Sequence, residues 1–212
     1  MSTEEILEEV AAEVSTCPKC DLCKSRTKAV PGEGNPHARI MFIGEGPGFH
    51  EDKQGRPFVG PAGQFLVELL ASINLKRSDV FITNVVKCRP PGNRDPLPAE
   101  INACNGYLER QIAAIDPEGI VTLGRHSMTK FFGAEKISSI HGRARKFDGR
   151  ICIAMYHPAA GLHQQSLKET IRSDFKKIPL IMAEAERQAA EEPRKTQAPK
   201  SKEEPPEQLA LF

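Results

Sequence analysis

The sequence predicts an α/β fold of three layers, α/β/α, built around a central, mostly parallel four-stranded sheet. Two observations predict it. Four short apolar segments alternate along the chain with segments whose apolar residues recur every three or four positions. Each apolar segment also runs directly into a loop of glycine, proline or polar residues. Strands separated by helices form parallel sheets with both faces covered, and loops at the carboxyl ends of the strands form the binding site.

The helices are assigned from apolar periodicity, and the strands from runs of apolar and β-branched residues. A proline at the start of the third helix suits the first helical turn, and a proline inside the last helix predicts a kink. In chain order, we expect helix 3–16, strand 40–43, helix 64–73, strand 80–86, helix 98–115, strand 119–123, a helix to about residue 132, strand 151–156 and helix 166–187 with its kink at Pro179.

Three parts are expected along the chain. Residues 1–187 form one domain, because they are numerous enough to bury a core and carry the whole alternation. Residues 188–207 are rich in Glu, Lys, Pro and Gln and have almost no large apolar group, so we expect a disordered linker. Residues 208–212, QLALF, place three large apolar side chains after this linker, which is typical of a peptide that binds a partner's groove.

The net charge of +1 is unevenly distributed. Residues 1–16 carry five acidic and no basic residues, and residues 183–207 carry seven acidic and five basic residues; removing these contributions of −5 and −2 leaves residues 17–182 at +8. A basic body favours a polyanionic partner such as nucleic acid. The chain has no run of about 18 apolar residues and no apolar signal segment, which predicts a cytoplasmic protein that does not span a membrane. We expect a monomer.

Six cysteines are present, three of them in the pattern C-x2-C-x2-C. In a cytoplasmic protein they indicate metal ligands or buried thiols rather than disulfides. Thiolates suit zinc and iron–sulfur centres equally, so ligand type does not identify the metal, and Cys17, Cys20 and Cys23 are all candidate ligands. Cys152 lies inside a predicted strand and is expected to be a small buried hydrophobic residue.

Six segments in order resemble the family 4 uracil-DNA glycosylases, the iron–sulfur type of bacteria and archaea. The resemblance covers roughly residues 14–187 and implies a parallel sheet flanked by helices. It also implies an enzyme that hydrolyses the N-glycosidic bond of uracil in single- or double-stranded DNA, leaves an abasic site and so initiates base excision repair. The segments are Cys17-x2-Cys20, GEGPGFHED at 44–52, GRPFVGPAG at 55–63, ITNVVKCRPP at 82–91, Cys104 and HPAAGL at 157–162.

The resemblance assigns three residues to the recognition of the flipped base. Phe58 matches the residue that stacks on uracil, although an ordinary core phenylalanine is the alternative. Asn84 has an amide whose donor and acceptor pair with O4 and N3–H of uracil and mismatch cytosine. His157 matches the motif histidine that donates a hydrogen bond to O2 as negative charge develops there.

From the same resemblance, we expect either Glu45 or Glu51 to supply the carboxylate that orients water or offsets the sugar cation. In the best-known uracil glycosylases an aspartate has this role, and its place here looks like Gly46. Gly48 falls where those enzymes carry a tyrosine that excludes thymine. The exclusion of thymine would then fall to Glu51 or to the pocket wall.

The resemblance also implies a [4Fe–4S] cluster bound by Cys17, Cys20, Cys88 and Cys104, with Cys23 as an alternative ligand. The cluster would hold the N-terminal segment against the loop that carries two arginines. The residues expected to contact DNA are Arg89, Arg94, the wedge candidate Leu162 and its neighbour His163.

The final QLALF resembles the pentapeptide by which bacterial proteins bind the sliding clamp, so Gln208 to Phe212 predict that partner. Two alternatives to the glycosylase remain. One is a non-catalytic iron–sulfur DNA-binding module, and the other is a relative that crosslinks to abasic DNA, whose expected Lys-Arg-Arg-Ile-His insertion is absent.

Overall fold

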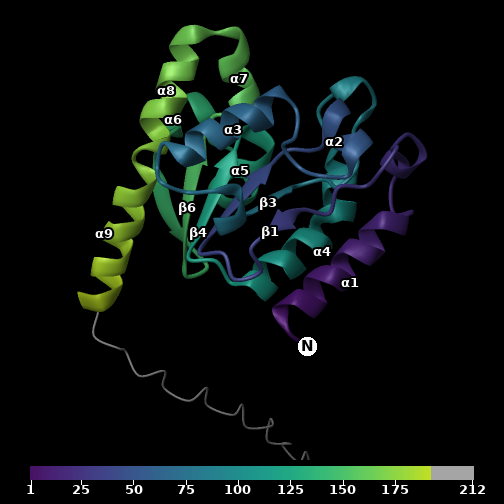
Figure 1. Ribbon diagram of the computed structural model, residues 1–212, viewed down its shortest axis with the longest axis horizontal. Coiled ribbons are helices and arrows are strands. Elements are labelled where there is room, and N and C mark those ends of the chain that lie inside the picture. The colour runs from purple at the N-terminus through teal and green to yellow at the C-terminus, as the bar shows by residue number, and fades with distance from the viewer. Residues whose placement is uncertain (192–212) are drawn as a thin grey trace, which may run out of the picture.

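The computed structural model describes residues 1–191 and has the predicted α/β architecture, with helices around a twisted central sheet (Figure 1). The sheet has six strands in the order β1-β3-β2-β4-β6-β5. All three pairings among the four central strands are parallel. These four strands are β2 (Ile40–Gly44), β3 (Phe81–Asn84), β4 (Gly119–Leu123) and β6 (Arg150–Met155), which confirms the four predicted strands.

The predicted strand number was too small, because two antiparallel edge strands were missed. β1 (Glu33–Gly34) has only two residues and pairs with β3. β5 (Ala144–Phe147) pairs with β6, and all four of its side chains are exposed. A strand of two residues, or one without an apolar face, has no alternation that a sequence pattern can detect.

Alternate residues of the central strands enter two separate cores, so helices cover both faces of the sheet. Phe42 and Ile82 pack with one group of helices, whereas Met41 and Phe81 point to the opposite face and pack with another. The first group is α3 (Pro61–Ala71), α8 (Gln165–Phe175) and α9 (Ile178–Glu191), and the second is α4 (Pro98–Ile115), α5 (Arg125–Phe132) and α6 (Ile137–Ile140).

A third, smaller core lies where α1 (Thr3–Thr16) packs along α4 (Figure 1). Val10 and Val14 of α1 are buried there beside Tyr107. Arg110 on α4 pairs with Glu9 and Glu13 of α1 at 2.9 and 2.6 Å. This core holds the N-terminal helix against the domain and brings the first cysteines close to α4.

The predicted last helix is two helices, α8 and α9, rather than one kinked helix. The break lies at residues 176–177, just before Pro179 at the second position of α9. Proline has no N–H to donate and its ring blocks the preceding carbonyl, so it suits a first turn better than an interior. α9 then continues to Glu191, four residues past the expected end, and the rest of the predicted linker and residues 208–212 lie outside the described part.

Five short elements occupy the loops, and three of them follow strands of the parallel sheet. The short elements are α2 (Phe49–Gln54), α7 (Pro158–His163), η1 (Asp21–Lys24), η2 (Arg77–Asp79) and η3 (Pro91–Asn93), of which α2, η3 and α7 follow β2, β3 and β6.

No helix within residues 1–191 has the length and apolar character needed to cross a membrane.

Candidate active site

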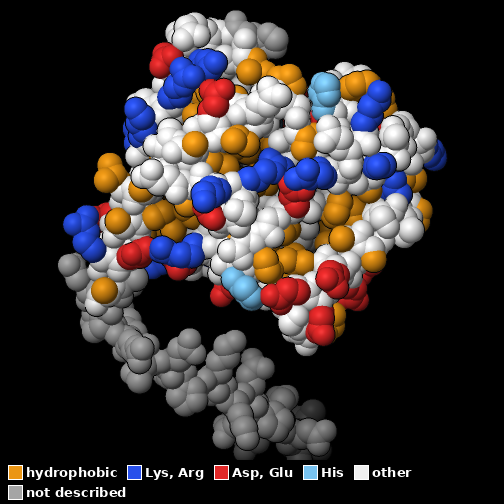
Figure 2. Space-filling view, viewed as in Figure 1, with side chains coloured by type: hydrophobic (Ala, Val, Ile, Leu, Met, Phe, Trp, Pro, Cys, Tyr) orange, Lys and Arg blue, Asp and Glu red, His pale blue; other side chains and the backbone are white. Residues whose placement is uncertain are grey.

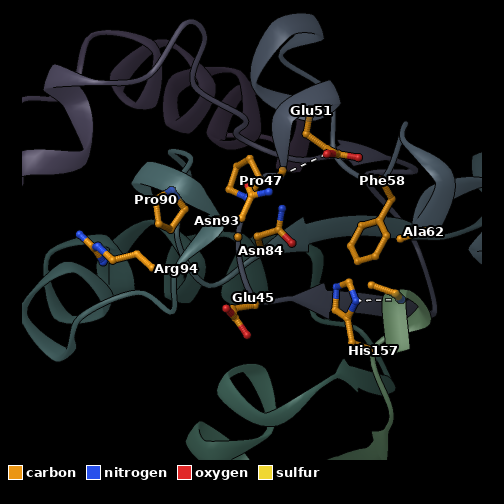
Figure 3. Close-up of a pocket in the computed structure, with 13 residues that line it drawn as sticks. Glu45, Pro47, Glu51, Phe58, Ala62, Asn84, Pro90, Asn93, Arg94 and His157 are labelled. Carbon is orange, nitrogen blue, oxygen red and sulfur yellow. Dashed lines mark hydrogen bonds between the residues drawn. The ribbon is translucent and has the colours of Figure 1, made fainter. Parts of the chain in front are cut away.

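A pocket of about 310 Å³ opens at the carboxyl ends of the parallel strands (Figure 3). Its walls come from the loops after β2, β3 and β6, which is where such sheets bind ligands. The structure therefore brings together eight of the residues expected to bind substrate, DNA or water. They are Glu45, Gly46, Gly48, Glu51, Phe58, Asn84, Arg94 and His157.

Asn84 ends β3 with its side chain directed at the pocket (Figure 3), and it is only 1% exposed. Its Oδ1 is buried and accepts no hydrogen bond from any residue in the described part of the chain. Gly44 is its partner on β2, and a Cβ there would lie 2.4 Å from Oδ1 and 2.8 Å from the ring of Phe58. The absence of a side chain at Gly44 thus makes room for both groups, a role that sequence reasoning missed.

Phe58 is held in a left-handed conformation, with φ of 51°, which is uncommon for a residue with a large side chain. Arg77 stabilises this turn by donating a hydrogen bond of 2.9 Å to the carbonyl of Phe58 and another to the carbonyl of Pro57. Glu33 pairs with Arg77 at 2.8 Å. The Phe58 ring lies against the imidazole of His157, with centroids 5.4 Å apart and planes 26° apart. Arg77 is a second residue that the sequence did not indicate.

His157 is the N-cap of α7, and its Nδ1 accepts a hydrogen bond of 3.1 Å from the backbone N–H of Ala159. With Nδ1 engaged as an acceptor, the neutral ring carries its proton on Nε2, which is left free to donate. Burial lowers the pKa of His157 to about 4, although the charge of Glu51 acts in the opposite direction. The geometry therefore provides a neutral hydrogen-bond donor near neutral pH.

Glu51 links two loops through its carboxylate. It accepts backbone hydrogen bonds from Gly48 at 3.1 Å and from Val59 and Gly60 at 2.9 Å each. A Cβ on Gly48 would lie 2.8 Å from Glu51 Oε2, so the glycine permits this approach. Three N–H donors leave this carboxylate largely engaged within the protein.

Glu45 differs from Glu51, because no residue in the described region donates a hydrogen bond to its carboxylate. Nε2 of His126 lies 3.9 Å from the Glu45 carboxylate and 3.4 Å from the Asp95 carboxylate, and one ligand atom of each of the three residues lies within 4.8 Å of the others. Burial raises the pKa of Glu45, and His126 partly offsets this effect. Glu45 lines the pocket on the side opposite Glu51 (Figure 3). Its carboxylate oxygens remain able to accept hydrogen bonds.

Three of the four predicted cluster ligands, Cys17, Cys88 and Cys104, are buried together, with Cys20 packed against them. Arg26 holds this region by donating to Cys88 Sγ at 3.2 Å and to the carbonyl of Cys17 at 3.0 Å. The remaining thiols are Cys23, which is partly exposed in η1, and Cys152, which is buried in β6 within a different core.

The spacing of the sulfur atoms bears on the kind of centre they fit. In residues 1–191 the one group of three potential metal ligands within 4.8 Å of one another is Glu45, Asp95 and His126, so no three thiols approach so closely. Around one zinc ion, sulfur atoms at Zn–S distances of about 2.3 Å would lie about 3.8 Å apart. Within residues 1–191, no three thiols therefore have the mutual spacing of a zinc site.

The residues expected to contact DNA are dispersed around the pocket. Arg94 lines it and is paired with Glu100 at 2.6 Å. Arg89 donates to Asn93 Oδ1 at 2.8 Å. Leu162 on α7 is 40% exposed and does not line the pocket, and the side chain of His163 lies outside what the structure describes.

Comparison with known proteins identifies the family. Residues 31–178 match the Uracil DNA glycosylase superfamily. A type-4 uracil-DNA glycosylase of Sulfurisphaera tokodaii is 50% identical over 81% of this chain and 83% of its own, and one of Archaeoglobus fulgidus is 49% identical over 82% and 92%. The chain belongs to the type-4 uracil-DNA glycosylases. A third such glycosylase, of Thermotoga maritima, is 45% identical over 82% of this chain and 93% of its own. Membership of the type-4 glycosylases confirms the predicted resemblance.

Proposed function

We propose that this protein is a uracil-DNA glycosylase that binds a flipped uracil in the pocket and hydrolyses its N-glycosidic bond. The observation that carries the proposal is the buried Oδ1 of Asn84, which has no donor in the described structure. A buried acceptor without a partner costs about 1–3 kcal/mol. Uracil N3–H supplies the missing donor, and uracil O4 accepts from the Asn84 amide nitrogen. Cytosine presents an acceptor at N3 and a donor at N4, so it meets the amide with both groups reversed.

Phe58 and His157 complete the recognition of the base. The ring of Phe58 stacks on uracil after the base leaves the duplex, which offsets part of the cost of a few kcal/mol for unstacking and unpairing. Nε2–H of His157 donates to uracil O2, where negative charge grows as the glycosidic bond breaks. A neutral donor placed in advance stabilises that charge without the reorganisation that water would need.

Glu45 is our candidate for the carboxylate that orients the attacking water, because its oxygens are free to accept hydrogen bonds. Glu51 keeps the loops around Gly48 and Phe58 in place and contributes to the wall that excludes the thymine methyl group. Water attacks the sugar carbon, uracil leaves as its anion, and the carboxylate of Glu45 stabilises the sugar cation and accepts the water proton.

A [4Fe–4S] cluster fits the thiols of Cys17, Cys20, Cys88 and Cys104, because four thiolates are the ligand set of such a cluster and these side chains share one core. The group would supply a crosslink between the N-terminal segment, the loop after β3 and α4. Serine replacement of each cysteine in turn, followed by iron and sulfide analysis, identifies the ligands. We expect Cys23→Ser to retain the cluster, and loss of iron in that variant would assign Cys23 instead.

Arg89, Arg94, Leu162 and His163 are the proposed DNA contacts, and single- or double-stranded DNA containing uracil is the proposed partner. The sliding clamp is a further proposed partner through residues 208–212. Deleting these five residues is expected to abolish clamp binding and to spare uracil release. Retained clamp affinity in the truncated chain would disprove this assignment. We propose that the protein acts as a cytoplasmic monomer.

Uracil release from a labelled oligonucleotide with one U:G pair tests the enzymatic proposal. Asn84→Ala and His157→Ala are expected to reduce kcat/KM by about 10²–10³-fold, the usual loss when a transition-state hydrogen bond is removed. Thermal unfolding of both variants checks that the fold is intact. DNA binding without uracil release by the wild type would favour the binding module, and a covalent adduct with abasic DNA on a denaturing gel would favour the crosslinking relative.

A further inference from the structure

Phe49 is an exposed aromatic residue at the start of α2, immediately after the pocket glycine Gly48. It is 46% exposed. Among the phenylalanines of residues 1–191, only Phe147 is also exposed. Burial of an aromatic side chain is favourable, and a phenylalanine left 46% exposed forgoes a large part of that gain. The position of this ring therefore needs an explanation in terms of what it contacts.

Two cations flank the Phe49 ring. Nζ of Lys53 lies 4.5 Å from the ring centroid, and the guanidinium carbon of Arg89 lies 5.3 Å from it. The imidazole of His50 meets the ring edge-on, with centroids 5.5 Å apart. Figure 2 shows hydrophobic, histidine and basic side chains gathered at the surface over α2. The result is an aromatic surface with positive charge on its margin.

The aromatic surface adjoins the uracil pocket on two sides. Gly48, which precedes Phe49, lines the pocket, and so does Pro90, which follows Arg89. Asn93 also lines the pocket, and it accepts the 2.8 Å hydrogen bond that fixes the Arg89 guanidinium. Phe49 and Arg89 each lie one residue along the chain from a residue that lines the pocket.

We propose that Phe49, Lys53 and Arg89 form a stacking site for a base next to the flipped uracil. This inference rests on the proposed function, because it requires DNA to enter the pocket. Flipping removes the stacking partner of each neighbouring base. An exposed aromatic ring replaces that partner whatever the base, and adjacent cations contact the phosphates on either side. The site therefore captures single-stranded DNA beside the pocket without reading its sequence.

Phe147 provides a matched control for this proposal. It is 42% exposed and meets Phe131 edge-on with centroids 5.5 Å apart. It pairs with Arg150 at the start of β6, whereas the pocket follows the end of that strand. Phe147→Ala therefore removes a similarly exposed ring, 42% against 46% for Phe49, at the opposite end of the sheet.

The test uses single-stranded oligonucleotides with 2′-fluoro-2′-deoxyuridine, which resists hydrolysis, and 2-aminopurine as its 5′ or 3′ neighbour. Stacking on Phe49 quenches the fluorescence of 2-aminopurine in one of the two positions. We expect the quench in the wild type, Phe49→Tyr and Phe147→Ala, and its loss in Phe49→Ala. The dissociation constant of Phe49→Ala should rise at least about fivefold, as base–aromatic stacking predicts.

Two results overturn the stacking site: no quench in the wild type at either position, or an equal quench and affinity in Phe49→Ala. Uracil release by the wild type from the unmodified oligonucleotide is measured alongside. Release without the quench refutes the stacking site alone. Absence of release refutes the proposed function instead, whatever the fluorescence shows.

Discussion

At the carboxyl end of β3, the buried polar groups on one face have hydrogen-bond partners within the protein, whereas a buried oxygen on the other face has none in the described residues. Behind Thr83, Nζ of Lys87 donates to Thr83 Oγ1 at 2.5 Å, to Gln111 Oε1 at 2.7 Å and to the carbonyl of Asn84 at 2.9 Å. Thr83 and Gln111 in turn both donate to the carbonyl of Pro31. On the other face, one residue further along, Oδ1 of Asn84 has no donor in the described structure.

This difference distinguishes polar groups that stabilise the fold from polar groups that are available to bind a ligand. Burying a polar group is costly unless a hydrogen bond replaces the water that it loses. The Lys87 network pairs its donors and acceptors within the protein, although burial still lowers the pKa of Lys87 to about 7. Oδ1 of Asn84 lacks such a partner, and Glu45 contrasts with Glu51 in the same way. Asn84 and Glu45 both line the pocket with an acceptor that has no donor in the described residues, which is why we assign the chemistry to them. Glu51 also lines the pocket, but three backbone hydrogen bonds engage its carboxylate.

The largest expected effect tests the pair of glutamates. Glu45→Gln removes the proposed base and should lower kcat for uracil release by about 10²–10⁴-fold with little change in stability. Glu51→Gln keeps an acceptor but loses the charge that strengthens three backbone hydrogen bonds, so it should mainly lower the unfolding temperature. Single-turnover kinetics and thermal unfolding of both variants make the comparison. The opposite pattern would exchange the two roles.

Lys87→Met breaks the satisfied network. The variant retains the volume of the side chain but leaves the oxygens of Gln111 and Asn84 short of a donor, so the free energy of unfolding should fall by about 2–4 kcal/mol. Denaturation in urea, with iron content checked, measures it. Lys130→Met is the control, because Lys130 makes partly exposed contacts with Asn105 and Glu109 and should cost less than about 1 kcal/mol. Equal losses in the two variants would mean that the buried network has no special role.

Gly44→Ala should disturb the side-chain amide of Asn84, whose Oδ1 has no donor in the described residues. The added Cβ would lie 2.4 Å from Asn84 Oδ1, so the amide must shift, and a shift of about 1 Å at a reacting site costs on the order of 10²-fold in rate. Gly106→Ala is the matched control, because a Cβ at Gly106 on α4 meets nothing within 4 Å. That substitution should leave kcat/KM unchanged and raise the free energy of unfolding by about 0.5–1 kcal/mol. Full activity of Gly44→Ala would show that the amide position is not critical.

Most of the sheet and much of the pocket could be predicted from the sequence, because apolar runs and motif residues are local signals. The four parallel strands follow from the apolar runs, and the meeting of Asn84, Phe58 and His157 at one pocket was implied by the family resemblance of their motifs. The network around Lys87 was not predictable, since a lysine in the sequence shows no sign that distant Thr83 and Gln111 will surround it. The same is true of Arg77, which supports Phe58 from a separate loop.

The smallest expected effect concerns pH and the pocket histidine. The pKa of His157 is about 4 in the folded protein, against about 6.5 in an unfolded chain. Between these values the unfolded chain binds more protons, so the stabilisation is complete above about pH 6.5 and is lost as the pH falls towards 4. At pH 5 the loss should be about 1–2 kcal/mol. Urea denaturation between pH 7 and pH 5 should show it in the wild type and to a smaller extent in His157→Asn. An equal slope in both proteins would mean that folding does not lower the pKa of His157.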